Sequence, residues 1–185
     1  FLARALCEYD ENGQIICPSY FSADEIELYN VAKSSGVKVV NRSYGGSAVL
    51  GDASESAVRA AYSEDISFQV NNSDMVFVTA AGNDGQDDVS LLSGLQYYYT
   101  NQMNTIAAVA TKQNGTIASW SNKCGRAKDF CLAVPGQSIT LPVPNDWWSV
   151  VCDGNTTSQT CSYLNQNRTN AYMRVSGTSF SSPTA

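Results

Sequence analysis

A serine that could attack a carbonyl group lies near the end of the chain, in the stretch RVSGTSFSSPTA. Ser179 follows Gly177 and Thr178 and precedes small residues and Pro183, a pattern that suits a tight turn into a helix. The first backbone amides and the positive dipole end of that helix would face the reacting carbonyl group. The same pattern is common at serines that only cap a helix. The stretch therefore predicts a nucleophile or a cap, and other segments must decide between them.

A second polar side chain that could act on a carbonyl group is Asn83, which follows the apolar stretch MVFVTAAG. The glycine before it, Gly82, would let the side-chain amide project into a cleft and donate a hydrogen bond to a developing oxyanion. Asparagine in Asn-Asp-Gly is also a common turn former, so the tripeptide 83–85 is equally at home in a loop. The tripeptide does not by itself favour either role.

Helix and strand patterns alternate along much of the chain. We predict helices over 22–36 and 54–72, and strands over 37–44, 74–84 and 105–115. The strand patterns are apolar on both faces and are separated by helices, which implies right-handed crossovers and a parallel sheet covered on both sides. The sequence therefore predicts an α/β fold.

Two segments show no clear period. We predict a loop with at most one short turn over 84–102, and a surface excursion between elements at about 141–170. Asp84, Asp87 and Asp88 in the first segment could ligate calcium, although an acidic loop is more often simply solvated. No other cofactor and no other metal site is expected.

Ligands of open parallel sheets bind beyond the carboxyl ends of the strands, and three such ends stand out here: NRSYGG, TAAGND and GTSFSSP. In this order they resemble the subtilisin-like serine proteases, or subtilases, which show Ser-x-Gly-Gly, Ala-Ala-Gly-Asn and Gly-Thr-Ser at these places. The segment TIAAVATKQNGTIASWSNKCGRAKDFCLAVPGQSI is similar to the same family, and its cysteine pair looks most like the subtilases of Gram-negative autotransporters. The resemblance covers about residues 22–140 and 172–185.

The resemblance implies a serine endopeptidase that cleaves peptide bonds through an acyl-enzyme. It implies that Ser179 is the nucleophile and Asn83 the oxyanion donor. One group of residues would form an edge on which an extended peptide adds as a strand: Ser43, Tyr44 and Gly45. Another would wall the pocket beneath the residue before the scissile bond: Ala80, Ala81 and Gly82. Thr178, beside the nucleophile, completes the expected substrate-binding set. Small residues at a strand end can also serve only to let a helix pack closely.

The chain departs from the family pattern in its catalytic acid and base. Subtilases carry Asp and His before Ser in the chain, yet this sequence has no histidine, and none of its early acids lies in the family's Asp-Thr/Ser-Gly setting. We therefore expect residues 1–185 to be the later part of a subtilase catalytic domain, incomplete at both ends and inactive without a missing N-terminal part. The alternative is a non-catalytic module that keeps a peptide groove. Retention of both Asn83 and Ser179 favours the protease.

Six cysteines form three close pairs along the sequence: Cys7 with Cys17, Cys124 with Cys131, and Cys152 with Cys161. Metal sites favour C-x2-C spacings with a histidine partner, and neither occurs here. Three short disulfide loops are the favoured reading, with buried free thiols as the alternative, and connectivity is open because six cysteines allow 15 pairings. Disulfides indicate an oxidising location, so we expect a secreted or cell-surface protein.

Charge and hydropathy restrict the partners. The formal net charge is −6 and the eleven Lys and Arg residues are scattered, which argues against nucleic acid as a partner. The longest apolar runs fall far short of the roughly 20 residues of a membrane span, so no span is expected. The expected partner is a peptide or protein substrate. Apolar sheet edge left exposed by missing strands would favour association with another copy or another chain.

Overall fold

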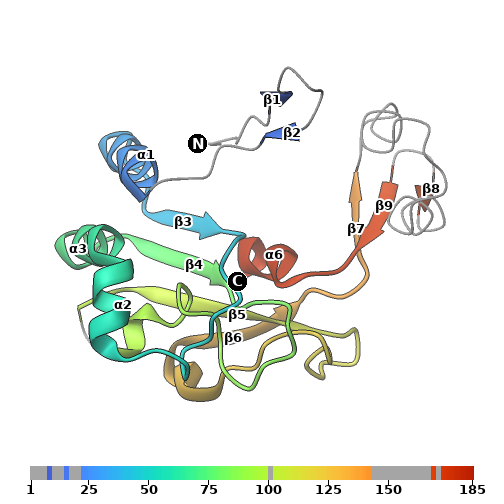
Figure 1. Cartoon of the computed structure of the whole chain (residues 1–185). Helices are drawn as coiled ribbons and strands as arrows, with labels where there is room; N and C mark the ends of the chain where they lie inside the picture. Colours follow the sequence, from blue (N-terminus) through green and yellow to red (C-terminus); the bar gives the residue numbers. More distant parts are fainter. Residues whose placement is uncertain (1–7, 10–14, 17–21, 100–101, 143–167, 170–171) are drawn as a thin grey trace.

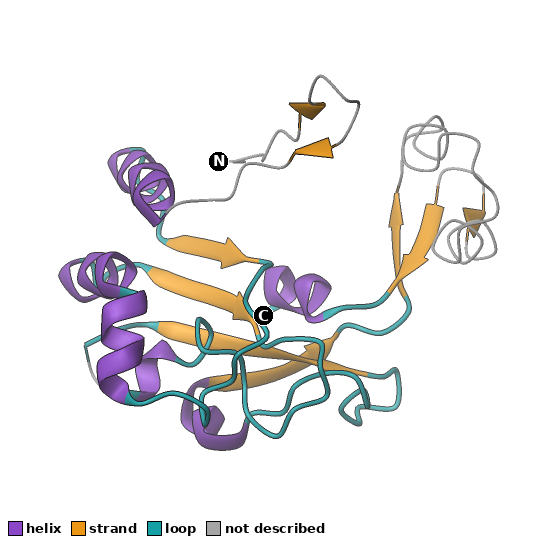
Figure 2. Ribbon diagram, viewed as in Figure 1, coloured by secondary structure: helices purple, strands orange, loops and turns teal. Residues whose placement is uncertain are grey.

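The computed structural model of the chain describes residues 8–9, 15–16, 22–99, 102–142, 168–169 and 172–185 (Figure 1). Its main feature is a four-stranded parallel sheet in the order β3-β4-β5-β6. These strands are β3 Val39–Arg42, β4 Val76–Ala80, β5 Thr105–Thr111 and β6 Cys131–Pro135. Helices flank the sheet in Figure 2, so the predicted α/β fold with a parallel sheet is confirmed.

The central strands explain the apolar runs of the sequence. Nearly every residue of β4 and β5 is buried, whereas in β3 and β6, at the two edges of the described sheet, only Arg42 at the end of β3 is buried. The strand β6 was not predicted, because its five residues are partly exposed and end in Pro135. Its parallel pairing with β5 is what makes this segment a strand.

The first helix, α1, spans Ser22–Ser34 and agrees with the predicted segment. Gly36 follows it with a φ of 79°, a left-handed conformation that favours glycine at the end of a helix. Four further elements are short. The strand β1 Glu8–Tyr9 is antiparallel to β2 Ile15–Ile16, and the 3-10 helices are η1 Leu95–Tyr97 and η2 Gly125–Phe130.

The single helix predicted over 54–72 is wrong. The chain forms two helices there, α2 Glu55–Ala61 and α3 Ser63–Asn71. Between them Tyr62 has φ −121° and ψ 25°, outside the helical region, although its N–H still donates to the Val58 carbonyl at 3.0 Å. Figure 1 shows α2 and α3 running in different directions. The spacing of apolar residues is the same on both sides of such a change of direction, so the sequence does not show the break at Tyr62.

A second sheet extends away from the parallel sheet in Figure 1 and leads into the C-terminal segment. It is antiparallel, in the order β7-β9-β8. Its strands are β7 Ile139–Pro142, β8 Arg168–Thr169 and β9 Tyr172–Val175. The predicted excursion at 141–170 overlaps two of these strands, because residues 141–142 belong to β7 and residues 168–169 form β8, and the rest of it falls outside the described residues.

The segment predicted as a loop, 84–102, contributes heavily to the core. Over residues 84–99 its backbone is irregular apart from η1, yet Val89 and Leu95 are completely buried. Its apolar side chains form one cluster with Val58 of α2, Ile66 of α3 and Met103, which follows the segment: Leu91, Leu92, Leu95 and Tyr99. An irregular backbone turns side chains inward at uneven intervals, so the segment is buried without showing a period in the sequence.

Arg42, at the end of β3, forms a buried ion pair with Asp65 of α3, with an N–O distance of 2.9 Å. Arg42 Nε also donates to Thr79 Oγ1 at 2.9 Å, and the amide of Gln69 donates to Asp65 at 3.1 Å. A buried charge that loses its partner is strongly destabilising. The network therefore holds the end of β3 against the sheet and α3, directly before Ser43.

Cys124 and Cys131 form a disulfide that closes a short loop around η2. This confirms one of the three predicted pairs. The other four cysteines lie outside the described residues: Cys7, Cys17, Cys152 and Cys161.

Replacement of both Cys124 and Cys131 by serine is expected to lower the free energy of unfolding by about 2–3 kcal/mol, because the open chain has more conformational entropy when unfolded. Urea unfolding of the variant and the native chain under non-reducing conditions measures the difference. In reducing buffer the two proteins should converge. Equal stability without reductant would show that the loop closure contributes nothing.

β3 lies at one edge of the described parallel sheet, and Val39 at its start is 60% exposed. An edge with an exposed apolar side chain can pair with a further strand. Self-association through this edge stays a prediction.

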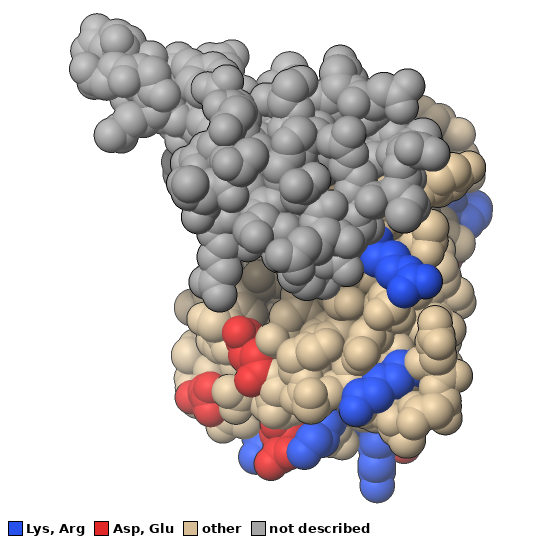
Figure 3. All heavy atoms as spheres, turned by 90° about the vertical axis from the view of Figure 1, so that its right-hand side faces the viewer, with Lys and Arg blue, Asp and Glu red and all other residues tan. Residues whose placement is uncertain are grey.

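Charged side chains are spread over the described surface. Figure 3 shows Lys and Arg together with Asp and Glu on one face, with neutral surface between most of them. Several of these charges form surface ion pairs: Lys38–Asp74, Arg59–Glu55 and Lys123–Asp87. Within the described ranges, no helix has both the length and the apolar character to cross a bilayer.

Candidate active site

The predicted nucleophile lies in a short helix, α6 Thr178–Ser181, continued by the 3-10 helix η3 Ser182–Thr184. This helix contacts β4, β5 and β6 (Figure 1). Gly136, directly after β6, makes the close approach possible, because a Cβ atom there would lie 2.1 Å from Ser181 Oγ and 2.6 Å from Ala110 Cβ. The helix that carries the predicted nucleophile can therefore pack on the sheet only because residue 136 is glycine.

Ser179 is hydrogen-bonded to Ser43, the first of the predicted peptide-binding residues. Its hydroxyl donates to the Ser43 carbonyl at 2.9 Å, and the Ser43 hydroxyl donates to the Ser179 carbonyl at 2.8 Å. Ser43 Oγ also lies 3.1 Å from Ser182 Oγ. Although 136 positions separate Ser43 and Ser179 in the sequence, the fold brings them together as predicted.

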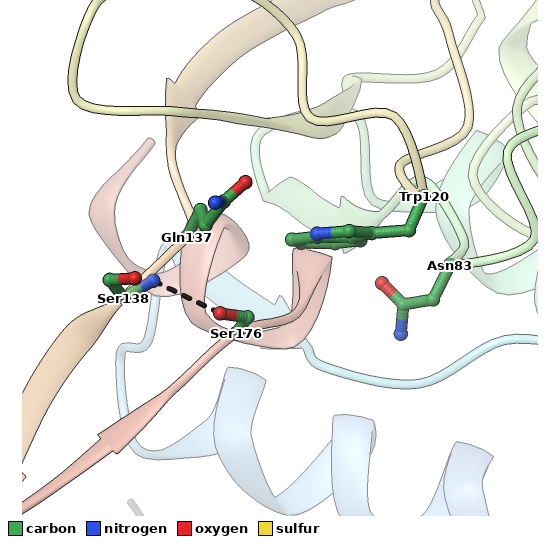
Figure 4. Close-up of a pocket in the computed structure, with 5 residues that line it drawn as sticks. All are labelled: Asn83, Trp120, Gln137, Ser138 and Ser176. Carbon is green, nitrogen blue, oxygen red and sulfur yellow. Dashed lines mark hydrogen bonds between the residues drawn. The ribbon is translucent and has the colours of Figure 1, made fainter. Parts of the chain in front are cut away.

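Asn83 is hydrogen-bonded to Thr178, the first residue of α6. Its Oδ1 accepts two hydrogen bonds from Thr178, one from the backbone N–H and one from the hydroxyl, both at 2.9 Å. Thr178 Oγ1 in turn accepts the N–H of Gly82 at 3.3 Å. Two donors on Oδ1 fix which side of the amide faces Thr178. The amide nitrogen, Nδ2, therefore lies on the other side of the amide from these two donors (Figure 4).

The turn that carries Asn83 is held by Asn122, a residue whose role the sequence did not reveal. Asn122 Oδ1 accepts the N–H groups of Asp84 and Gln86 at 3.0 and 3.2 Å, and its own N–H donates to the Gly82 carbonyl at 3.0 Å. Gly82 has a φ of 113°, and a Cβ atom there would lie 2.5 Å from Asn122 Nδ2. Glycine before Asn83 is thus required both by the backbone conformation and by Asn122.

The edge predicted to bind peptide is open. Tyr44 is 47% exposed, and Gly45 is exposed as well. Among the described residues, no hydrogen bond occupies the backbone groups of Tyr44, Gly45 or Gly46. Unpaired backbone groups in an extended segment are what an added peptide strand requires.

The second predicted substrate group lies deeper. Ala80 and Ala81 are 4% and 0% exposed, and Ala81 belongs to a core cluster, so their side chains pack inside the domain. Gly82 is partly exposed beside Thr178, which is itself fully buried. Only Gly82 of the three has surface at the site. The substrate role of Ala80 and Ala81 stays a prediction.

A cavity of about 480 Å³ opens beside Asn83. It is lined by residues from four separate segments: Asn83, Trp120, Gln137, Ser138 and Ser176 (Figure 4). The Ser138 N–H donates to Ser176 Oγ at 3.0 Å and joins the ends of β7 and β9 next to the cavity. The sequence did not single out Trp120, Gln137, Ser138 or Ser176, because they meet only through the fold.

Two of the three acidic residues considered for calcium, Asp87 and Asp88, have partners in the protein. Asp87 pairs with Lys123 at 2.6 Å, and Asp88 accepts the Arg126 N–H at 2.7 Å. Within the described part of the chain, no three His, Cys, Asp or Glu side chains form a group that could hold a metal ion. Calcium binding stays a prediction.

Comparison with known proteins gives the family. Residues 18–185, nearly the whole chain, match the sequence model of the subtilase family. The chain belongs to the subtilase family. A curated relative of this subtilase chain is the serotype-specific antigen 1 of Mannheimia haemolytica, 38% identical over 74 residues, or 40% of this chain and 8% of that protein.

Solved structures share the fold of this subtilase chain. The prenylagaramide maturation protease PagA matches with a TM-score of 0.56 and 19% identity, over 90% of this chain and 47% of that one. The self-cleaved protease domain of PatA matches with a TM-score of 0.57 and 21% identity, over 89% of this chain and 48% of that one. A lanthipeptide protease matches with a TM-score of 0.55 and 18% identity, over 95% of this chain and 50% of that one. The chain thus spans about half the length of these structures.

A subtilase serine needs a base, because a hydroxyl group is a poor nucleophile at neutral pH until its proton is accepted. The 185-residue sequence contains no histidine. In the structure the Ser179 hydroxyl donates to a backbone carbonyl, which cannot take its proton. The described residues therefore present a candidate nucleophile and a candidate oxyanion donor without a base.

Proposed function

We propose that this subtilase chain supplies the nucleophile, the oxyanion donor and the peptide-binding edge of a serine endopeptidase, whose general base comes from residues outside these 185. The family and the protease fold support the reaction type. The observation that carries the proposal is the fixed amide of Asn83. Because Thr178 donates twice to Oδ1, the amide is held with Nδ2 on its other side, from which it can donate to a carbonyl oxygen of the substrate.

In the proposed reaction the Ser179 hydroxyl leaves the Ser43 carbonyl and attacks the carbonyl carbon of a peptide bond, while the base takes its proton. The carbonyl oxygen becomes negative and accepts a hydrogen bond from Asn83 Nδ2. The C–N bond then breaks, and the leaving amine takes the proton from the base. Water cleaves the resulting ester of Ser179 by the same steps, which returns the free serine and releases the acid product.

A second candidate function is peptide binding without catalysis. The absence of histidine from the sequence favours it, and so does the Ser179 hydroxyl bound to a carbonyl group. A binding groove, however, has no need of an amide held as firmly as that of Asn83. Catalysis by an enzyme completed with a histidine-bearing segment would separate the two functions.

Replacement of Asn83 by alanine is expected to lower turnover of the completed enzyme by roughly 10²–10³, with little change in KM, because the donor acts on charge that develops in the transition state. This magnitude is the one known for the oxyanion donor of subtilisin, a member of the same family. Steady-state cleavage of a fluorogenic peptide measures both constants.

Asn83→Asp is the matched control. A carboxylate keeps an acceptor for both Thr178 donors but has no N–H to give to an oxyanion. If Asn83 acts as a donor, Asn83→Asp should lose at least as much turnover as Asn83→Ala. If its role is only to hold Thr178, Asn83→Asp should retain activity, and the proposed role of Asn83 would be wrong.

We also propose that the protein acts outside the cytoplasm. The Cys124–Cys131 disulfide supports this location, because such bonds persist in oxidising compartments. The relative described as a serotype-specific antigen is compatible with it. Fractionation of the producing cells, with the protein detected in the medium or at the cell surface, tests the location.

A further inference from the structure

The backbone of segment 120–123, which we call the clamp, pairs with the turn that carries Asn83. Three N–H···O=C bonds of 2.9 to 3.0 Å join the two segments, from Gly85 to Trp120, from Lys123 to Gln86 and from Asn122 to Gly82. These bonds engage the turn both before and after Asn83. Trp120 of the clamp and Asn83 also line the same cavity (Figure 4). The position of Asn83 therefore depends on the clamp.

The side chain of Asn122 completes this pairing. The N–H groups of Asp84 and Gln86, which the backbone of the clamp leaves without an acceptor, both donate to Asn122 Oδ1. Asp84 directly follows Asn83, so the first of these bonds fixes the peptide unit next to the candidate oxyanion donor. Asn122 is 1% exposed. An apolar side chain in its place would leave two backbone donors facing a group that cannot accept a hydrogen bond.

The clamp is itself fixed to the parallel sheet. Ser121 Oγ accepts the N–H of Ala110 in β5 and donates to the Asn122 carbonyl, both at 2.9 Å. Cys124, directly after the clamp, is joined to Cys131 of β6 by the disulfide. Asn122 thus holds the turn from a point that is attached to two strands of the sheet.

The charge of the side chain at position 122 also bears on its role. Nδ2 of Asn122 is buried, and among the described residues nothing accepts a hydrogen bond from it. A carboxylate would accept the same two bonds without an unpaired buried donor. It would also place a negative charge beside a turn whose asparagine has to stabilise a developing negative charge. A neutral acceptor is therefore the suitable support for an oxyanion donor.

We infer that Asn122 is a positioning residue for the oxyanion donor: it sets the turn that carries the Asn83 amide and acts on turnover only through Asn83. The inference rests on the proposed function, since it assumes that Asn83 donates to the oxyanion. Asn122 is not a catalytic residue, because both hydrogen bonds of its side chain go to the backbone of the turn.

Replacement of Asn122 by leucine, which has nearly the same size and no acceptor, tests the inference in the completed enzyme. Turnover should fall by about 10- to 100-fold with little change in KM, because displacement of a catalytic group by about 1 Å costs up to about 10²-fold. The loss should not exceed that of Asn83→Ala. Steady-state cleavage of a fluorogenic peptide measures both constants.

A double-mutant cycle separates positioning from a general structural role. Asn122→Leu should cause no further loss of turnover when it is added to Asn83→Ala, because no amide is then left to position. A residue that only supports the fold would cost the same factor in both backgrounds. Equal losses in the two backgrounds, or no loss in the native one, would overturn the inference. Unchanged turnover in Asn83→Ala alone would instead contradict the proposed function.

Asn72→Leu is the matched control for loss of stability. Asn72 is also a buried asparagine, and its Nδ2 donates to the Phe68 carbonyl at 2.7 Å. It lies before β4, however, whereas Asn83 lies after that strand. Asn72→Leu should lower stability and leave turnover unchanged. If it lowered turnover as much as Asn122→Leu, the effect of Asn122 would be one of stability alone, and the inference would be wrong.

Hydrogen exchange in the 185-residue chain provides a readout that does not require catalysis. Asn122→Leu should speed exchange of the Asp84 and Gln86 amides by about 10-fold, the factor for loss of one hydrogen bond. Asn122→Asp keeps both acceptors and should keep the native rates. Native rates in Asn122→Leu would contradict the inference. If Asn122→Leu does not fold, Asn122→Ser, whose side chain is shorter by one bond, goes through the same cycle and the same exchange measurement.

Discussion

Replacement of Ser179 by alanine is expected to abolish peptide hydrolysis by the completed enzyme, with a loss of about 10⁶ in turnover. The reason is that no acyl-enzyme can form without the hydroxyl, so all steps after substrate binding are lost together. Loss of the nucleophile in subtilisin, a member of this family, costs about 2 × 10⁶. Single-turnover cleavage of a fluorogenic peptide measures the loss, and anisotropy should show nearly unchanged peptide binding.

Ser182→Ala is the matched control for this variant. Ser182 is buried in the same cluster, and its hydroxyl lies 3.1 Å from Ser43 Oγ. It is not placed to attack a substrate, so its removal should change turnover by no more than the loss of one neutral hydrogen bond allows, about 10-fold. If Ser179→Ala retained substantial turnover, Ser179 would be only a helix cap and the protease proposal would fail.

The 185-residue chain by itself is expected to be inert as a protease and to leave Ser179 unlabelled by a fluorophosphonate probe. The sequence contains no histidine, and the Ser179 hydroxyl donates to the Ser43 carbonyl. Without a base the loss should equal that of a subtilisin without its histidine, about 2 × 10⁶ in turnover, because the catalytic groups act as a unit. Intact mass after probe treatment and peptide cleavage assays measure both expectations.

Addition of a histidine-bearing segment that completes the site should restore labelling of Ser179. Circular dichroism of the untreated chain serves as the control, because a folded spectrum would exclude unfolding as the cause of a negative result. Stoichiometric labelling of Ser179 in the chain alone would contradict the prediction. It would mean that a group other than histidine accepts the proton.

The parts of the fold that the sequence predicted are those with strong local patterns. The buried runs at β4 and β5 and the helical run at α1 were found because each carries its own period and ends at glycine or polar residues. The break at Tyr62, the burial of 84–102 and the strand β6 were missed. Each of these depends on contacts with distant segments, which local periodicity does not report.

The candidate site shows the same division. The sequence indicated Ser179 and Asn83 and predicted that both follow strands of a parallel sheet, where their side chains would meet. Asn83 does follow β4 of the parallel sheet, but the strand before Ser179 is β9 of the antiparallel sheet, so that part of the prediction is wrong. The sequence did not indicate Asn122, which holds the turn around Asn83. A lone asparagine carries no pattern of its own, so its role becomes visible only through its partners.

The sequence by itself determined which chemical groups this protein has: a serine in Gly-Thr-Ser, an asparagine after a buried strand, a cysteine pair seven residues apart and no histidine. Only the tertiary structure decided how these groups are oriented. Thr178 turns the Asn83 amide although 95 positions separate them, and Ser43 accepts the Ser179 hydroxyl across 136 positions. Local signals act within one turn or strand, whereas the direction of a hydrogen bond between distant residues depends on the path of the whole chain between them.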